Sequence, residues 1–128
     1  MHENEIAEGA VEAAFKVHRW FGPGLLESAY EVCLVHELVD MGFTVETQVA
    51  LPVVYRGVTL DAGYRLDIWL NRKVIIEVKA VEELHPVHTA QMITYLKLTE
   101  NRLGLLINFR SALLKDGIRR IVNNLTEE

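Results

Sequence analysis

The chain has 128 residues, of which 50% are hydrophobic and 24% are charged, and its formal net charge is −5. This profile excludes a disordered or collagen-like chain, and we expect residues 1–128 to form one globular domain with its own core. The single cysteine, Cys33, excludes an internal disulfide and a cysteine-ligated zinc or iron–sulfur site.

The lengths of the apolar stretches, the acidic first residues and the net charge narrow the class of protein further. No stretch approaches the roughly 20 apolar residues that span a bilayer, and acidic residues stand where a signal peptide is basic. We therefore expect a cytoplasmic protein without a membrane partner. The negative net charge argues against coating of nucleic acid through bulk electrostatics, but it allows a local basic track or carboxylates neutralised by a metal ion.

Two long helices are predicted at the start of the chain. Residues 4–20 carry apolar side chains at spacings of three and four, with acidic residues early and basic residues late, as the helix dipole favours. Residues 21–24 interrupt this pattern. A second run with helical spacing covers residues 25–41 and ends at Gly42, which is expected to be a C-terminal cap.

Strands are predicted after Gly42, where the apolar residues begin to alternate. Alternation covers part of residues 43–55, and a turn leads to a short strand at 58–60. The β-branched runs 64–70 and 74–80 are separated by three residues only, which predicts a tight antiparallel hairpin.

The last part of the chain predicts a helix between strands. Pro86 fits the first turn of a helix that extends to about Glu100. The continuous apolar run 103–109 is typical of a strand buried on both faces. Residues 117–124 are interpreted as an edge strand, with a short helix left open. The order helix, helix, four strands, helix, strand and a final edge strand indicates an α/β domain with a mixed sheet.

The hairpin is predicted to bring two acidic residues together. With the three-residue loop 71–73, Leu70 pairs with Val74, and counting back places Asp67 opposite Glu77. Directly opposed side chains lie about 4.5 to 5.5 Å apart. A two-residue loop would turn Glu77 into the core, and the cost of burying a charge there favours the three-residue loop.

Alternation also assigns the side chains of the hairpin to two faces. One face is apolar and is expected to form the core: Leu66, Ile68, Leu70, Val74, Ile76 and Val78. The other face is expected to hold the polar groups, with Arg65 opposite Lys79: Arg65, Asp67, Trp69, Ile75, Glu77 and Lys79.

Paired carboxylates beside a lysine suggest phosphodiester hydrolysis. Asp67 and Glu77 would repel each other unless a proton or a cation lay between them, and Mg²⁺ or Mn²⁺ takes oxygen ligands of this kind. A metal polarises a phosphate and activates water, while Lys79 can neutralise the charge that develops. From the hairpin alone, a solvated face with ordinary ion pairs is the favoured alternative, because acid-x-Lys is frequent by chance.

Residues beyond the hairpin favour the hydrolytic site over the solvated face. Asp67 is followed by Glu77-Val78-Lys79, and then by Gln91 and Tyr95 on the next helix. This order resembles the PD-(D/E)XK nuclease superfamily, and in particular its RecB-type branch with a Gln-x-x-x-Tyr motif. Residues 24–30, Gly-Leu-Leu-Glu-Ser-Ala-Tyr, resemble the GxxExxY family of that superfamily. The similarity covers nearly the whole chain. The proline of the superfamily's name is absent here.

The resemblance implies a restriction-endonuclease-like fold with a mixed central sheet flanked by helices. It also implies a metal-dependent nuclease of nucleic acid, with DNA expected as the substrate ahead of RNA. It implies Asp67, Glu77 and the Val78 backbone carbonyl as ligands of Mg²⁺ or Mn²⁺, Lys79 as the catalytic lysine, and Glu27 as an upstream acid that assists the metal site. The implied or candidate substrate contacts are Gln91, Tyr95, His88 and Tyr30.

Several alternatives remain open at this stage. Glu27 could serve only the positive end of the second helix, and Gln91 and Tyr95 could be a surface pair. Tyr30 could be a core aromatic whose hydroxyl reaches a polar partner. The alternative function is a non-cleaving binding or scaffold module that keeps the nuclease fold in an assembly, and hydrolysis of another phosphate ester is a third. A homodimer is compatible with each of these.

Overall fold

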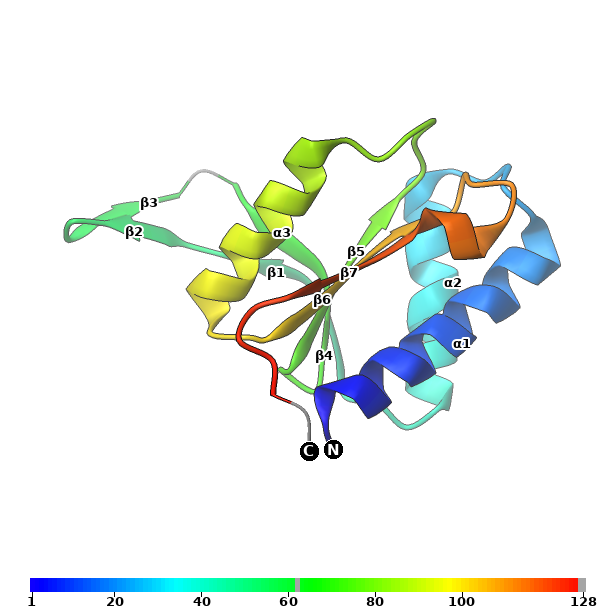
Figure 1. Cartoon of the computed structure of the whole chain (residues 1–128), viewed down its shortest axis with the longest axis horizontal. Helices are drawn as coiled ribbons and strands as arrows, with labels where there is room; N and C mark the ends of the chain where they lie inside the picture. The colour runs from blue at the N-terminus through cyan, green and yellow to red at the C-terminus, as the bar shows by residue number, and fades with distance from the viewer. Residues whose placement is uncertain (62, 127–128) are drawn as a thin grey trace.

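The computed structural model describes residues 1–61 and 63–126, and Figure 1 shows helices on both sides of a twisted sheet. Across these residues, none of the helices has the length and apolar character needed to cross a membrane. The elements in chain order are α1 (Glu3–Phe21), α2 (Glu27–Asp40), β1 (Val45–Ala50), β2 (Val53–Tyr55), β3 (Val58–Leu60), β4 (Arg65–Leu70), β5 (Val74–Lys79), α3 (Pro86–Thr99), β6 (Leu103–Asn108), the 3₁₀ turn η1 (Leu114–Gly117) and β7 (Ile118–Val122).

The main sheet has five strands in the order β1-β4-β5-β6-β7. Every neighbouring pair is antiparallel except β5 and β6, which are parallel and are joined by α3 as the crossover. This arrangement confirms the predicted α/β class with a mixed sheet flanked by helices, and β7 confirms the predicted edge strand.

The region between α2 and α3 contains five strands rather than the predicted four. The alternating segment 43–55 is divided at Leu51 and Pro52 into β1 and β2, because proline has no N–H to donate to a ladder. β2 and β3 then pair only with each other and form a hairpin that projects from the body of the protein (Figure 1).

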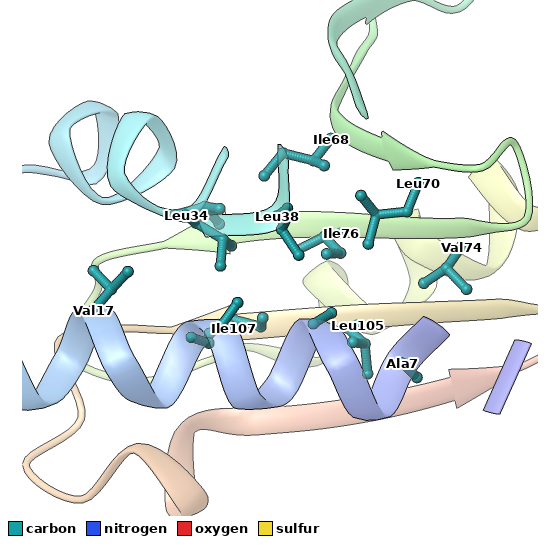
Figure 2. Packing of buried hydrophobic residues seen from close by; sticks show 14 of the residues in the cluster. Ala7, Val17, Leu34, Leu38, Ile68, Leu70, Val74, Ile76, Leu105 and Ile107 are labelled. Atoms are coloured by element: carbon teal, nitrogen blue, oxygen red, sulfur yellow. The ribbon is translucent and has the colours of Figure 1, made fainter. Parts of the chain in front are cut away.

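The core lies on both faces of the sheet. Side chains of α1 and α2 pack on one face, where Figure 2 shows Val17, Leu34 and Leu38 beside residues of the strands. On the other face, Met92, Tyr95 and Leu96 of α3 form a second cluster with four strand residues: Leu66, Ile75, Leu106 and Ile121.

This second cluster corrects the predicted faces of the β4–β5 hairpin. The face expected to be polar is largely covered by α3, and Ile75 is fully buried there. Leu66 packs in the same cluster instead of beside Ile68. The regular pairing of β1 with β4 is interrupted at Gln48, which has a φ of +50°, and at Asp67, so side-chain alternation does not continue through this point.

The β4–β5 hairpin has the predicted three-residue loop, and Leu70 pairs with Val74. Asn71 and Arg72 both have positive φ, and the Lys73 N–H donates to the Leu70 carbonyl. The regular ladder ends at the pair of Ile68 and Ile76. The predicted pairing of Arg65 with Lys79 is therefore wrong.

Tyr30 is a core residue that fixes the connection between α1 and α2. Its ring is fully buried and stacks on Phe109, with ring centroids 4.6 Å apart. The hydroxyl donates to the Gly22 carbonyl and accepts from the Leu25 N–H at 3.0 Å. This burial contradicts the assignment of Tyr30 as a substrate contact and matches the alternative of a core aromatic with a polar partner.

Replacement of Tyr30 by phenylalanine tests this structural role. Tyr30→Phe leaves the Gly22 carbonyl and the Leu25 N–H without their partner, so we expect the free energy of unfolding to fall by about 1–3 kcal/mol. Urea denaturation measures the change, with Tyr55→Phe on the exposed β2–β3 hairpin as the matched control. Equal stability of the two variants would contradict the assignment.

Candidate active site

Asp67 and Glu77 bond to each other's strands at the point where the β4–β5 ladder ends. The Asp67 N–H donates to Oε2 of Glu77 at 2.8 Å, and the Val78 N–H donates to Oδ2 of Asp67 at 2.9 Å. Each carboxylate thus takes the place of a ladder acceptor on the opposite strand. The structure brings these two residues together just beyond the last regular pair of the ladder, rather than as the directly opposed ladder pair that was predicted, and they are called the carboxylate pair below.

Burial disfavours the doubly ionised form of the carboxylate pair. Glu77 is only 5% exposed, and burial followed by the charge of Asp67 raises its pKa to about 8, although the Asp67 N–H and Lys79 act in the opposite direction. Burial also raises the pKa of Asp67, against the hydrogen bond from Val78 and the charge of Lys79. Without a cation, the pair therefore retains a proton near neutral pH.

Two acids of α2 lie beside the pair. Oε1 of Glu27 accepts from the Ala80 N–H at 3.2 Å, at the end of β5. Both carboxylate oxygens of Glu31 accept from Nε2 of Gln48 at 3.0 Å, and the same nitrogen lies 3.5 Å from Oδ1 of Asp67. Burial, together with the charges of Asp67 and Glu27, raises the pKa of Glu31 despite the bond from Gln48.

Glu31 and Gln48 are not among the site residues predicted from the sequence. Glu31 stands four residues after Glu27, on the same face of a helix, and this spacing could have identified it. No sequence signal identifies Gln48, because its position depends on the pairing of β1 with β4 and on its own positive φ.

Lys79 occupies the last position of β5, where the backbone is held by β6. The Lys79 carbonyl accepts from the Phe109 N–H at 2.9 Å, and Lys79 pairs in parallel register with Asn108. The positive charge of Lys79 partly offsets the rise in the pKa of Asp67 and in that of Glu77.

Asn108 fixes the chain just beyond Lys79 and was also missed. Its buried amide accepts from the Val81 N–H at 3.1 Å and donates to the Val81 carbonyl at 2.9 Å. A lone polar residue within the apolar run 103–109 was the available signal. Because buried polar groups need partners, this residue type indicates a hydrogen-bonded position rather than a strand interior.

The helix α3 contributes the predicted His88, Gln91 and Tyr95. Nδ1 of His88 accepts from the His85 N–H at 3.1 Å, and partial burial followed by the charges of Lys79 and His85 lowers the pKa of His88. Burial and the nearby Glu77 raise the pKa of Tyr95 to about 12, while a hydrogen bond from Gln91 acts in the opposite direction. His88 and Tyr95 therefore lie near the charged groups of the site.

The carboxylate pair has the chemistry that a hard divalent cation requires. One oxygen of each acid accepts a hydrogen bond from a backbone N–H. The raised pKa of Glu77 means that its ionised form lacks compensating positive charge, which a bound cation would supply. Within residues 1–61 and 63–126, no three His, Cys, Asp or Glu residues lie close enough to hold an ion together. A Mg²⁺ site built from two carboxylates, with water and phosphate as further ligands, fits this donor set.

A cavity of about 700 Å³ lies away from the carboxylate pair, between α1 and α2. Trp20 and Val32 line it together with Cys33, and none of its lining residues belongs to the carboxylate pair or bonds to it. The size of this cavity does not make it the candidate active site, because Asp67, Glu77 and Lys79 are not among its lining residues.

The comparison with protein families agrees with this geometry. A model described as the PD-(D/E)XK nuclease superfamily matches residues 4–121. The chain belongs to the PD-(D/E)XK nuclease superfamily. Members of this superfamily are in general nucleases that typically use divalent metals, so membership supports nuclease activity of this chain. Comparison with curated proteins and with solved structures finds no significant match.

The raised pKa of Glu77 predicts how stability depends on pH in the metal-free protein. A carboxyl whose pKa is higher in the folded state stabilises the fold fully below its unfolded pKa, near 4.5, and this contribution is lost as pH rises through about 8. In EDTA, the free energy of unfolding should therefore fall between about pH 5 and about pH 8, by on the order of 4 kcal/mol.

The variant Glu77→Gln isolates this contribution, because an amide stays neutral at every pH. Urea denaturation at several pH values should show a much flatter profile for Glu77→Gln than for the wild type. Glu12→Gln, an exposed position on α1, is the matched control and should keep the wild-type slope. A wild-type slope in Glu77→Gln would show that another group causes the dependence.

Proposed function

We propose that this chain is a metal-dependent nuclease that hydrolyses phosphodiester bonds of nucleic acid, with DNA preferred over RNA. The observation that carries the proposal is the reciprocal bonding of Asp67 and Glu77 across two strands, with Lys79 two positions along. Within the superfamily, we place the chain in the GxxExxY family and the RecB-type branch. The GxxExxY acid Glu27 bonds to the end of β5, and Gln91 and Tyr95 lie on α3, which supports this placement.

In this proposal, Asp67, Glu77 and the Val78 backbone carbonyl hold Mg²⁺ or Mn²⁺. A metal bound there supplies Lewis-acid polarisation of the phosphate and lowers the pKa of the attacking water. Lys79 neutralises the negative charge that develops on the phosphate oxygens or orients the water. Glu27 is assigned as the upstream acid that assists the site from α2.

We assign Gln91, Tyr95 and His88 as contacts to the substrate. An amide and a phenol can donate hydrogen bonds to phosphate or sugar oxygens without adding a formal charge. The net charge of −5 provides little bulk attraction for nucleic acid, so local contacts and the metal must supply the affinity.

We further propose that residues 1–128 act as one catalytic domain in the cytoplasm, where a reducing environment suits the free thiol of Cys33. One carboxylate pair per chain can act on one phosphodiester at a time. Simultaneous cleavage of both strands of a duplex would therefore require a homodimer.

Cleavage assays with active-site variants test the proposed reaction. Asp67→Ala and Lys79→Ala should each lower the initial rate by at least about 100-fold, because each removes a group that stabilises charge in the transition state. Rates are measured on single-stranded and duplex DNA and on RNA, with Mg²⁺ or Mn²⁺ and with EDTA. Lys73→Ala, an exposed lysine just before the same strand, is the matched control and should keep the wild-type rate.

Equal residual cleavage by the wild type, Asp67→Ala and Lys79→Ala would reject the proposal, since a contaminant would then be the source. Absence of cleavage in every preparation, on every substrate in the panel, would instead favour a non-cleaving binding or scaffold protein.

Calorimetric titration with Mn²⁺ tests the metal site without requiring turnover. The wild type should bind the ion, and Asp67→Asn should weaken binding at least tenfold because it removes a charged oxygen ligand. Glu12→Gln serves as the control and should bind as the wild type does. No heat of binding at millimolar Mn²⁺ would contradict the proposed metal site.

A further inference from the structure

A second cavity, of about 530 Å³, lies between the base of the β2–β3 hairpin and α3. Val53 of β2 and Tyr64, just before β4, line one side. Ala90, Gln91 and Tyr95 of α3 line the other. This volume is within the range of roughly 300–1,000 Å³ that is typical of small-molecule sites.

The lining of this cavity suits a flat, uncharged group. None of the described residues that line it carries a formal charge, and its polar atoms are amide and hydroxyl groups such as those of Gln91 and Thr94. Tyr64 as a residue is 43% exposed, and its ring meets the ring of Tyr95 edge-on, with centroids 6.3 Å apart. The lining offers no cation to balance the charge of a phosphate held inside the cavity, whereas its aromatic ring and neutral hydrogen-bonding groups suit a nucleobase.

The cavity lies beside the proposed active site, and Tyr95 connects the two. Tyr95 lines the cavity and packs in the same buried cluster as Leu66, the residue directly before Asp67, and Ile75, two residues before Glu77. A nucleotide whose phosphate lies at the carboxylate pair therefore has an uncharged aromatic cavity beside it.

We propose that this cavity holds an unpaired nucleobase of the substrate, stacked on Tyr64, next to the phosphate bound at the carboxylate pair. The inference rests on the proposed function and narrows its substrate class to nucleic acid with a single-stranded segment or a frayed end. A base inside a duplex has both faces covered by its neighbours, so it can stack on Tyr64 only after leaving the helix.

Equilibrium binding of oligonucleotides tests the inference. The Lys79→Ala protein with Mn²⁺ is titrated with single-stranded DNA, with the blunt duplex of the same sequence, and with the corresponding RNA strand. Single-stranded DNA should bind more tightly than the duplex. In this background, Tyr64→Ala should weaken single-strand binding by roughly 5- to 150-fold and remove the preference over duplex, because one base–aromatic stack is lost.

Three further variants separate stacking from folding effects. Tyr64→Phe keeps the ring and should bind as the parent does. Ala90→Trp removes no contact but fills the cavity from an exposed helix position, and it should reproduce the loss caused by Tyr64→Ala. Tyr55→Ala, an exposed aromatic on the β2–β3 hairpin outside the cavity lining, is the control and should leave binding unchanged.

Either of two binding results would overturn the inference: Tyr64→Ala and Ala90→Trp could bind single strands as the parent does, or the blunt duplex could bind as tightly as the single strand. A cleavage result could also overturn it: Asp67→Ala would abolish cleavage, but Tyr64→Ala would leave the rate unchanged on both paired and unpaired substrates. The proposed function would then stand. Tyr64-dependent binding of single strands in a protein that never cleaves would support the cavity and reject the nuclease.

Discussion

The site depends on one electrostatic constraint, the placement of two carboxylates where a β ladder would otherwise continue. Asp67 and Glu77 each accept a backbone N–H from the opposite strand, so the strands remain joined while the regular pairing ends. Burial and mutual repulsion disfavour two negative charges at this point. A proton or a cation must compensate them, and this requirement connects the fold to metal chemistry.

Pairing of β5 with its neighbours and side-chain hydrogen bonds to the backbone just beyond it hold this arrangement in place. β5 lies between β4 and β6, and Asn108 secures the chain beyond Lys79 through Val81. From the other side, Glu27 of α2 bonds to the Ala80 N–H. Residues positioned by paired strands are held more closely than residues on loops, so the acids and the lysine are preorganised before substrate binds.

The sequence predicted those features that depend on local patterns. The three-residue loop, the pairing of Leu70 with Val74 and the helix start at Pro86 follow from alternation and turn chemistry. The contribution of Gln48 could not be predicted, because it requires the pairing of distant strands and a positive φ. Leu66 was misassigned for the same reason, since alternation assumes an uninterrupted ladder.

The central claim is that the carboxylate pair shares a divalent cation, and the most direct measurement is anomalous diffraction from a crystal soaked with Mn²⁺. The account predicts a single anomalous peak between the carboxylates of Asp67 and Glu77 in the wild type, and no peak there in Asp67→Asn. Well-ordered carboxylates without a peak between them at millimolar Mn²⁺, or a peak of equal height in Asp67→Asn, would contradict it.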